Sequence, residues 1–198
     1  MRRVRPLALA ALAAAAALLT GCAAVVIGGA AAGALVATDR RLPDVMLADE
    51  RIEHQASSRI AERLKSEGHV NVTSFNRQVL LTGEATTEAL KQEAERIARG
   101  VPDVRGVVNE IAVAAPSSLG ARSNDAYLTS VVKSRMVAAG KFNPVHVKVV
   151  TEAGTVYLMG LVTRREADEA TQIARTTAGV RRVVRVFEFI ADPPPAQS

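Results

Sequence analysis

The side chains that most often do chemistry are few in this sequence and are not arranged for catalysis. The chain of 198 residues contains one cysteine, Cys22, and three histidines, His54, His69 and His146. No two histidines have the spacing of paired metal ligands, and no acidic cluster accompanies them. Neither a His/Asp arrangement nor an oxyanion motif accompanies the serines on expected helices, Ser57, Ser58, Ser130 and Ser134. We therefore expect a protein that is not an enzyme and that binds no metal or cofactor.

Cys22 stands at the end of a segment typical of secretion. Residues 1–5 carry three arginines, residues 7–19 are only leucine and alanine, and Thr20 and Gly21 are small. These are the three parts of a secretory signal. The apolar run is shorter than the roughly 20 residues of a membrane-spanning helix. The last four residues of the segment, Leu19-Thr20-Gly21-Cys22, resemble the lipobox of bacterial lipoproteins.

The lipobox resemblance implies that residues 1–21 are removed and that Cys22 is lipidated on its sulfur and acylated on its new amino group. Several acyl chains form a stable anchor, since each buried methylene contributes about 0.8 kcal/mol. Ala23 replaces the aspartate that retains such proteins in the inner membrane, so the periplasmic face of the outer membrane is favoured. Two plainer interpretations stay open, a buried free cysteine and an uncleaved anchor that continues through residues 23–37.

The composition limits the number of domains and the kind of hydrophobic core that the rest of the chain can form. Removing residues 1–21 leaves 177 residues, enough for one ordinary domain or two small ones. Aromatic residues make up 3% of the chain, so a core must consist of Val, Leu, Ile and Ala. The three arginines of the signal leave with it, which lowers the formal net charge from +5 to +2.

An internal repeat organises the remaining sequence. The stretch "VLLTGEATTEALKQEAERIARGVPDVRGVVNEI" at 79–111 matches "VYLMGLVTRREADEATQIARTTAGVRRVVRVFEF" at 156–189. In both, a V-x-L-x-G strand end precedes a helical segment and a later pair of valines. Alternating valines upstream predict a hairpin in each copy, with turns at Asn76-Arg77 and at Glu152-Ala153-Gly154. Two copies of one small module are therefore expected.

Each module is predicted to begin with a helix and to contain a second helix after its hairpin. The first helices show apolar stripes, with Asn124 or Asp125 as the N-cap in the second copy. The last strands are expected at 104–113 and 180–190. This predicts an α+β fold of two tandem modules, each helix-strand-strand-helix-strand, with two helices packed on one face of a three-stranded mixed sheet. The expected segments are a signal peptide at 1–21, a lipidated tether at 22–43, module 1 at 44–115, a linker at 116–121, module 2 at 122–191 and a disordered tail at 192–198.

The duplicated V-x-L-x-G and V-x-x-V motifs, together with "SNDAYLTSVVKSRM" and "YLMGLVTRREA", resemble the BON domain family over about 44–190. Among its members, the lipoproteins of the Gram-negative outer membrane with two BON domains are most similar. That resemblance implies binding of anionic phospholipids, such as phosphatidylglycerol or cardiolipin, through the first helix of the second module. It also implies a role in outer-membrane integrity and enrichment at the division site.

The two copies differ in charge in a way that favours the second as the lipid-binding module. Residues 44–115 carry nine Lys/Arg and twelve Asp/Glu, whereas residues 122–191 carry eleven and six. Beside the apolar stripe, Arg51 and Gln55 of the first copy correspond to Tyr127 and Val131 of the second. An aromatic residue with aliphatic neighbours and a basic rim is typical of an interfacial helix. The candidate lipid-binding residues are Tyr127, Leu128, Val131, Lys133 and Arg135.

Other interpretations of these residues stay open. Tyr127 and Val131 alternatively pack against the first module. Arg181, Arg182 and Arg185 are either a solvated strand edge or a lipid-facing patch, and Lys141-Phe142 either extend the lipid contact or anchor the loop after the helix. The rival function is a periplasmic adaptor for envelope assembly or cell-wall remodelling proteins, through the acidic residues Glu84, Glu88, Glu93 and Glu95. Nucleic acid is excluded as a partner by the compartment.

Overall fold

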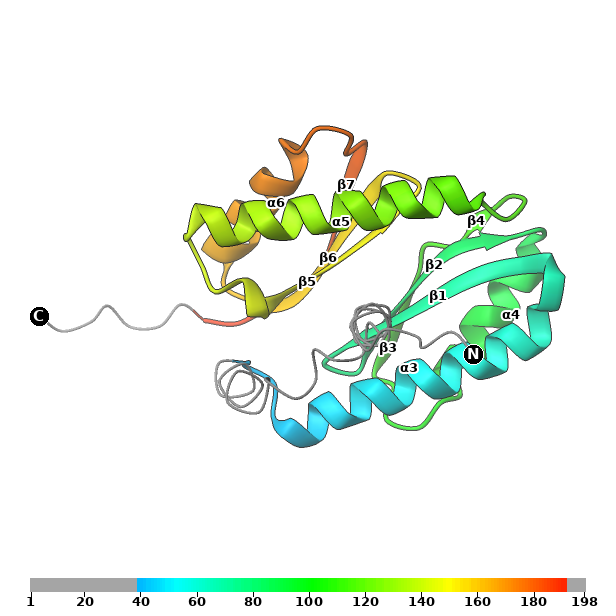
Figure 1. The fold of residues 1–198 in the computed structure, drawn as a ribbon. Helices are drawn as coiled ribbons and strands as arrows, with labels where there is room; N and C mark the ends of the chain where they lie inside the picture. Colours follow the sequence, from blue (N-terminus) through cyan, green and yellow to red (C-terminus); the bar gives the residue numbers. More distant parts are fainter. Residues whose placement is uncertain (1–38, 192–198) are drawn as a thin grey trace, which may run out of the picture. The chain divides into compact units, whose positions relative to one another are not determined.

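The computed structural model describes residues 39–191. The predicted signal peptide, the predicted lipidation site Cys22, most of the predicted tether and the predicted tail at 192–198 lie outside the described residues. All described helices and strands belong to one compact unit that begins at Arg40 (Figure 1). The buried residues of its three hydrophobic clusters all lie between Ile52 and Ala174. Residues 40–191 therefore contain the whole described core.

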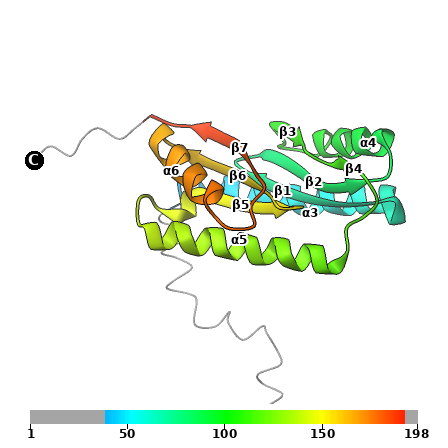
Figure 2. The ribbon, with the colours of Figure 1, turned by 90° about the horizontal axis from the view of Figure 1, so that it is seen from above.

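The α+β fold with two αββαβ modules is confirmed. The first module consists of α3 (Pro43–Leu64), the short 3-10 helix η2 (Lys65–Glu67), β1 (Gly68–Phe75), β2 (Gln78–Ala85), α4 (Glu88–Arg99), β3 (Gly106–Asn109) and β4 (Ala112–Val113). The second consists of α5 (Leu119–Ala139), the 3-10 helix η3 (Pro144–His146), β5 (Val147–Glu152), β6 (Thr155–Val162), α6 (Arg164–Arg175) and β7 (Arg182–Phe189). Figure 2 shows the helices and strands of both modules from above.

Both sheets are mixed, because each hairpin is antiparallel and the last strand adds to it in parallel. Val79 pairs with Val107 in the first sheet, and Val156 pairs with Val183 in the second. The strand expected at 104–113 is interrupted, because the Asn109 side chain accepts a hydrogen bond from the Ile111 backbone N–H at 3.2 Å. Strands β3 and β4, on either side of the interruption, pair with β2 in the same parallel register.

A buried aspartate in the first helix of each module holds the hairpin turn. Asp49 accepts hydrogen bonds from the backbone N–H groups of Asn76 and Arg77 at 2.9 and 2.7 Å. Asp125 accepts from those of Ala153 and Gly154, both at 2.9 Å. All four turn residues have positive φ, as a tight two-residue hairpin turn requires.

The start of α5 corrects the expectation that Asn124 or Asp125 caps this helix. The helix begins at Leu119, inside the segment expected to be a linker, and the Ser118 hydroxyl accepts a hydrogen bond from the Ala121 backbone N–H at 3.2 Å. Asp125 lies almost two turns further on and is only 6% exposed. Its carboxylate serves the hairpin rather than the helix end.

Each module has its own core between its helices and its sheet. In the first, the α3 stripe packs with α4 on the Val79 and Leu81 face of β2. In the second, Val132 and Met136 of α5 pack with α6 on the Val156 and Leu158 face of β6. Alternate residues of a strand face opposite sides of a sheet. The strand side chains that point away from the helices must therefore be buried against another part of the molecule.

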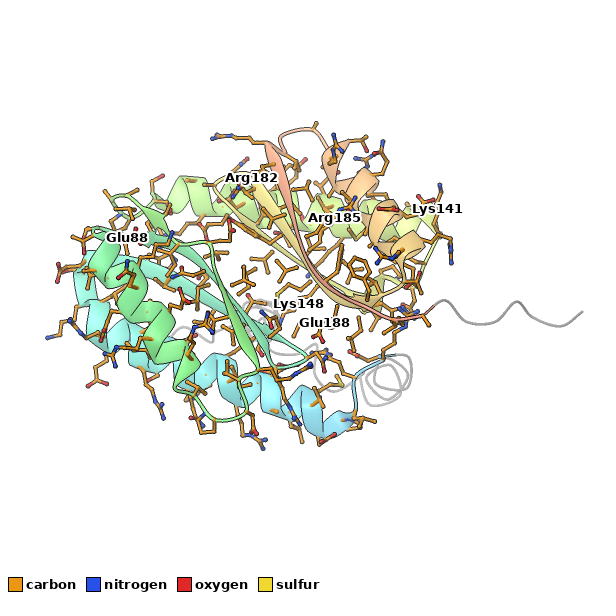
Figure 3. The ribbon with its side chains drawn as sticks, turned by 180° about the vertical axis from the view of Figure 1, so that it is seen from behind. Glu88, Lys141, Lys148, Arg182, Arg185 and Glu188 are labelled. Atoms are coloured by element: carbon orange, nitrogen blue, oxygen red, sulfur yellow. The ribbon has the colours of Figure 1, made fainter. Side chains whose placement is uncertain are left out.

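The two sheets cover each other. A third cluster joins Phe75 and Leu80 of the first module to Tyr157 and Met159 of the second, and all four are at most 4% exposed. Polar contacts surround it, namely Asn71–Glu152, Lys148–Glu53, Arg182–Glu110, Asn76–Glu188 and Arg105–Glu188. Lys148 and Glu188 lie where the modules meet (Figure 3). Each small module therefore buries both faces of its sheet, which the sequence did not predict.

Candidate membrane-docking site on the second module

The five candidate residues of α5 do not share one environment. Tyr127 is 64% exposed, and Lys133 and Arg135 are also exposed, whereas Val131 is half-buried. Leu128 is 3% exposed. The structure therefore places Tyr127, Lys133 and Arg135 at the surface, Val131 at its margin and Leu128 in the interior.

Leu128 belongs to the buried stripe of α5 because it stands one and two turns before Val132 and Met136. Its side chain lies against Gly179 in the loop between α6 and β7. A Cβ atom at Gly179 would approach the Leu128 Cδ2 atom to 2.9 Å, and the φ of +91° there also favours glycine. Leu128 thus fixes the position of α5 against this loop and offers no surface to a ligand.

The exposed face of α5 carries two further large apolar side chains that sequence reasoning missed. Leu119 is 80% exposed and Val137 is 66% exposed. These two residues are five helical turns apart, so they project from the same side of the helix, and Tyr127 lies between them along its length. The sequence prediction places Leu119 in the linker at 116–121, although Ser118 before it is a good N-cap.

Acidic side chains are absent from a long part of the chain that includes this face. Between Ala126 and Thr151 there is no Asp or Glu, whereas four basic residues occur, Lys133, Arg135, Lys141 and Lys148. Asp125, just before this stretch, is buried and bonded to the hairpin turn. The outer surface of α5 therefore combines apolar groups with positive charge.

Arg135 is held at the end of α6. Its guanidinium donates hydrogen bonds to the Ile173 carbonyl at 3.1 Å and to the hydroxyls of Thr177 and Thr176 at 2.6 and 3.1 Å. None of these acceptors is an acid. The group is thus oriented without being neutralised, which leaves its positive charge beside the exposed face of α5.

The residues after α5 anchor the chain instead of extending that face. Phe142 is 9% exposed and packs in the core of the second module. Lys141 forms an ion pair with Glu169 at 3.1 Å. Of the two interpretations of this loop, the structure supports the one in which it fixes the end of the helix.

Comparison with known proteins agrees with the duplicated architecture. The family model described as "BON domain" matches residues 48–115 and 124–191. The chain belongs to the BON domain family. The "Outer membrane lipoprotein DolP" of Haemophilus influenzae is 39% identical over 159 residues, which cover 79% of this chain and 82% of that protein. The "21 kDa hemolysin" of Actinobacillus pleuropneumoniae is 32% identical over 77% of this chain and 79% of its own length. "Osmotically-inducible protein Y" of Escherichia coli is 32% identical over 58% of each chain.

Two arginines fix the chain where it enters the BON domains. Arg40 binds Glu166 of the second BON domain at 2.6 Å and donates to the Leu161 carbonyl at 2.8 Å. Arg41 binds Asp49 of the first at 2.8 Å and stacks over the Phe75 ring. Burial alone would raise the pKa of Glu166, but the hydrogen bonds from Arg40 and the Thr163 backbone outweigh it and hold the pKa below its ordinary value.

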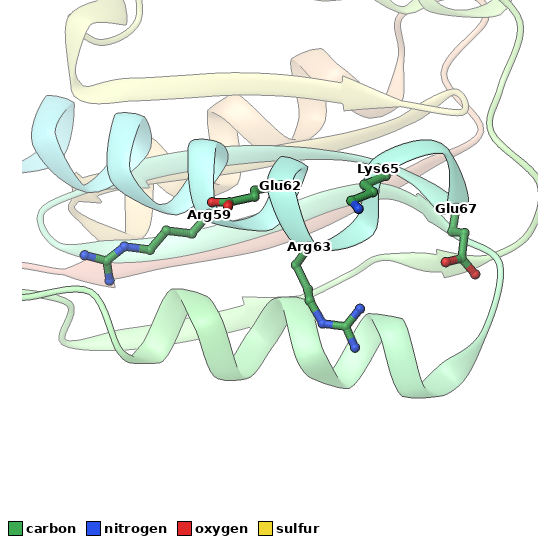
Figure 4. A pocket seen from close by; sticks show the side chains of 5 residues that line it. All are labelled: Arg59, Glu62, Arg63, Lys65 and Glu67. Atoms are coloured by element: carbon green, nitrogen blue, oxygen red, sulfur yellow. The ribbon is translucent and has the colours of Figure 1, made fainter.

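The first BON domain offers a hollow of a different kind at the end of α3. Its volume is about 530 Å³, and it is lined by Arg59, Glu62, Arg63, Lys65 and Glu67 (Figure 4). Both signs of charge occur in this lining. Arg63 is also paired with Glu93 of α4 at 3.4 Å. Such a balanced surface does not select an anionic ligand.

Two kinds of site have no counterpart in residues 39–191. No three His, Cys, Asp or Glu side chains in this part of the chain come together as a metal site requires. Nor does any of its helices combine the length and the apolar character needed to cross a membrane. Within the described residues, the outer face of α5 carries Leu119, Tyr127 and Val137, three of the eight large apolar side chains that are exposed.

Proposed function

We propose that this protein is an outer-membrane lipoprotein that is anchored through acyl chains on Cys22 and docks on anionic phospholipids with the outer face of α5. The similarity to an outer membrane lipoprotein over most of both chains supports the compartment. The observation that carries the docking proposal is the exposed series Leu119, Tyr127 and Val137 on a helix whose outer face lacks acids. Binding of phosphatidylglycerol or cardiolipin in this way serves the integrity of the outer membrane.

The proposed mechanism divides attachment between two parts of the molecule. The acyl chains hold the protein at the membrane, so that binding by α5 becomes an intramolecular step at high effective concentration. Apolar side chains enter the headgroup boundary while Lys133 and Arg135 meet the lipid phosphates. Weak intrinsic affinity is then sufficient, and local lipid composition biases where the protein resides, including at the division site.

Vesicle binding by a protein comprising residues 39–198 tests this proposal. We expect it to bind vesicles that contain phosphatidylglycerol or cardiolipin and to bind neutral vesicles at least about tenfold more weakly. The double variant Tyr127→Ala/Val131→Asp should lose the binding. Because Val131 is half-buried, Tyr127→Ser/Val137→Ser serves as a second variant confined to exposed positions.

The first BON domain supplies the matched control. Arg51→Ala/Gln55→Asp changes the two equivalent positions of α3 and should leave binding unchanged. Equal binding by the native protein and both α5 variants would show that α5 is not the docking element.

The adaptor function receives less support from the arrangement of the acidic residues proposed for it. Glu93 is bound by Arg96 and Glu95 by Arg99, each pair lying on α4 itself. Glu84 is 6% exposed and accepts a hydrogen bond from the Ser117 backbone N–H at 3.2 Å. Of the four residues, only Glu88 is both exposed and outside any ion pair among the described residues, which leaves little acidic surface for a protein partner.

A further inference from the structure

A second hollow in the second BON domain is lined by positive charge alone. It lies between the end of α6 and the start of β7 and has a volume of about 340 Å³. Thr171 and the arginines Arg175, Arg181, Arg182 and Arg185 contribute to its lining. Figure 3 shows Arg182 and Arg185 on β7. No acidic side chain lines this hollow, in contrast to the one in the first BON domain.

The equivalent place in the first BON domain can be located residue by residue. Helices α4 and α6 are both 12 residues long and both follow a threonine N-cap, Thr87 and Thr163. Counting from these caps, Glu95 is equivalent to Thr171 and Arg99 to Arg175. In the sheets, Leu81 pairs with Asn109 and Leu158 pairs with Arg185, which makes Asn109 the equivalent of Arg185.

In the first BON domain, a carboxylate fills this place. Arg99 donates to Glu95 Oε1 from Nη2 at 2.7 Å and from Nε at 3.0 Å, and Asn109 donates to Glu95 Oε2 at 3.0 Å. The hydrogen bonds from Arg99 and Asn109 lower the pKa of Glu95 below its ordinary value. An internal anion thus satisfies the arginine at the end of α4.

In the second BON domain, the internal anion is missing and a cation has been added. Thr171 is 5% exposed, and its hydroxyl donates to the Ala167 carbonyl at 2.6 Å. Arg185 replaces the neutral Asn109. Arg175 and Arg181 have no acidic partner among residues 39–191. The side chain of Asp168, which pairs with Arg185, is 69% exposed, and an ion pair so open to water is weak.

We propose that Arg175, Arg181 and Arg185 bind a phosphate ester in the position that the Glu95 carboxylate takes in the first BON domain. Guanidinium groups bind phosphate oxygens through paired hydrogen bonds, so three of them around one hollow suit this anion. Arg182 is left out because its partner Glu110, at 2.9 Å, is only 29% exposed, whereas the partner of Arg185 is largely open to water. The ester is the headgroup phosphate of an anionic lipid. The identification of the ester as a lipid headgroup rests on the proposed function. The inference that the hollow binds a phosphate ester does not.

The test compares a soluble phosphate ester with the same group in a membrane. Glycerol 3-phosphate is titrated into the protein comprising residues 39–198, and the NMR signals of the arginine side chains are followed. We expect the signals of Arg175 and Arg185 to shift. Thr171→Glu, which restores the internal carboxylate, should weaken binding at least about tenfold, while the neutral Thr171→Gln of equal size should not.

Two further variants keep the test independent of any folding defect at the buried Thr171. Arg175→Gln/Arg185→Gln changes exposed positions only and should also weaken binding at least about tenfold. The reverse exchange, Glu95→Thr/Asn109→Arg, should create a second phosphate site in the first BON domain, seen as a shift of the Arg99 side-chain signal.

The outcomes separate this proposal from the docking function of α5. Tyr127→Ala/Val131→Asp should keep glycerol 3-phosphate binding and lose vesicle binding. If Thr171→Glu and Thr171→Gln bind the ester equally, or if the native protein shows no shift at Arg175 and Arg185, the phosphate site is wrong and α5 docking stands on its own result. If the ester binds but vesicles of phosphatidylglycerol do not, the hollow binds a free phosphate ester and the docking function is wrong.

Discussion

Helices α3 and α5 take equivalent places in the two BON domains (Figure 1). Their outer faces differ in charge and in exposed apolar side chains. Both bury one side chain per turn, from Ile52 to Leu64 in α3 and from Leu128 to Met136 in α5. Along its 22 residues, α3 also carries five acidic residues and three arginines. The 21 residues of α5 include three basic residues and one acid, the buried Asp125. Where Arg51 is exposed on α3, Tyr127 is exposed on α5.

Separate residues determine the folded framework of the module and the surface that it presents. Both copies keep the buried aspartate under the hairpin turn and the threonine N-cap of the second helix. Both also keep a glycine in the second strand, Gly83 or Gly160, where a Cβ atom would collide with a backbone carbonyl oxygen. The exposed positions differ freely, because exchanges there change stability little. The same module fold can therefore present an acidic surface in one copy and a basic, apolar surface in the other.

The largest expected effect concerns the shared frame, at Asp49 and Asp125. Replacing either by alanine leaves backbone N–H groups of the hairpin turn without an acceptor in a largely buried place. Asp49 accepts three hydrogen bonds from its hairpin and also binds Arg41, whereas Asp125 accepts two. We expect Asp49→Ala to lower the free energy of unfolding by about 3 kcal/mol and Asp125→Ala by about 2 kcal/mol, as measured by urea denaturation.

The control for this pair is Asp44→Ala in the first turn of α3, where the side chain is 71% exposed. Its effect should stay below about 0.5 kcal/mol. A cost as small as this at Asp49 or Asp125 would mean that the buried carboxylates do not hold the turns.

A smaller effect that depends on pH separates the two hairpins. Glu152 ends β5 where Phe75 ends β1, so a carboxyl group stands in the place of an aromatic ring. Burial raises the pKa of Glu152 above 4.5, and the neighbouring carboxylates of Glu84 and Asp125 raise it further, against the hydrogen bond from Asn71. The folded protein thus holds this proton more tightly than the unfolded chain does.

The sign of the pH dependence follows from that difference. The group contributes stability below pH 4.5, and this contribution is lost as the pH rises through the raised pKa. Glu152→Gln should therefore gain stability relative to the native protein between pH 4 and pH 7, in urea denaturation at both values. Glu95→Gln should change in the opposite direction, because the pKa of Glu95 is lowered. The same trend in both variants would contradict this assignment.

The module fold could be predicted from the sequence because it depends on local and repeated patterns. The V-x-L-x-G strand ends, the apolar stripes and the turn residues occur twice, and each copy supports the interpretation of the other. The packing of sheet on sheet could not be predicted, because Leu80 or Met159 in an apolar strand signals burial without saying against what. Likewise, Asp125 looked like an N-cap because its true partners, the N–H groups of residues 153 and 154, are distant in sequence.

The sequence predicts where the candidate site lies, on the first helix of the second module, but not all of the residues that form it. Tyr127 was found because its equivalent in the repeat is charged. Leu128 is predicted to bind lipid although it belongs to the apolar stripe of the helix, and the structure buries it at 3% exposure. The sequence points to the arginines of β7 as a candidate lipid-facing patch. Their relation to the exchange of Glu95 for Thr171 requires the strand registers and helix caps of the two domains.

The smallest expected effect on stability is at the position where the two first helices differ most. Tyr127 is 64% exposed and the side chain of Arg51 is 62% exposed, with its partner Asp103 at 4.0 Å. Tyr127→Ser and Arg51→Ser should therefore each change the free energy of unfolding by less than about 0.5 kcal/mol. If Tyr127→Ser instead cost as much as a core truncation, about 2 kcal/mol or more, the ring would be a structural residue. With both costs small, a greater loss of vesicle binding in Tyr127→Ser than in Arg51→Ser reflects the surface of the second BON domain and not partial unfolding.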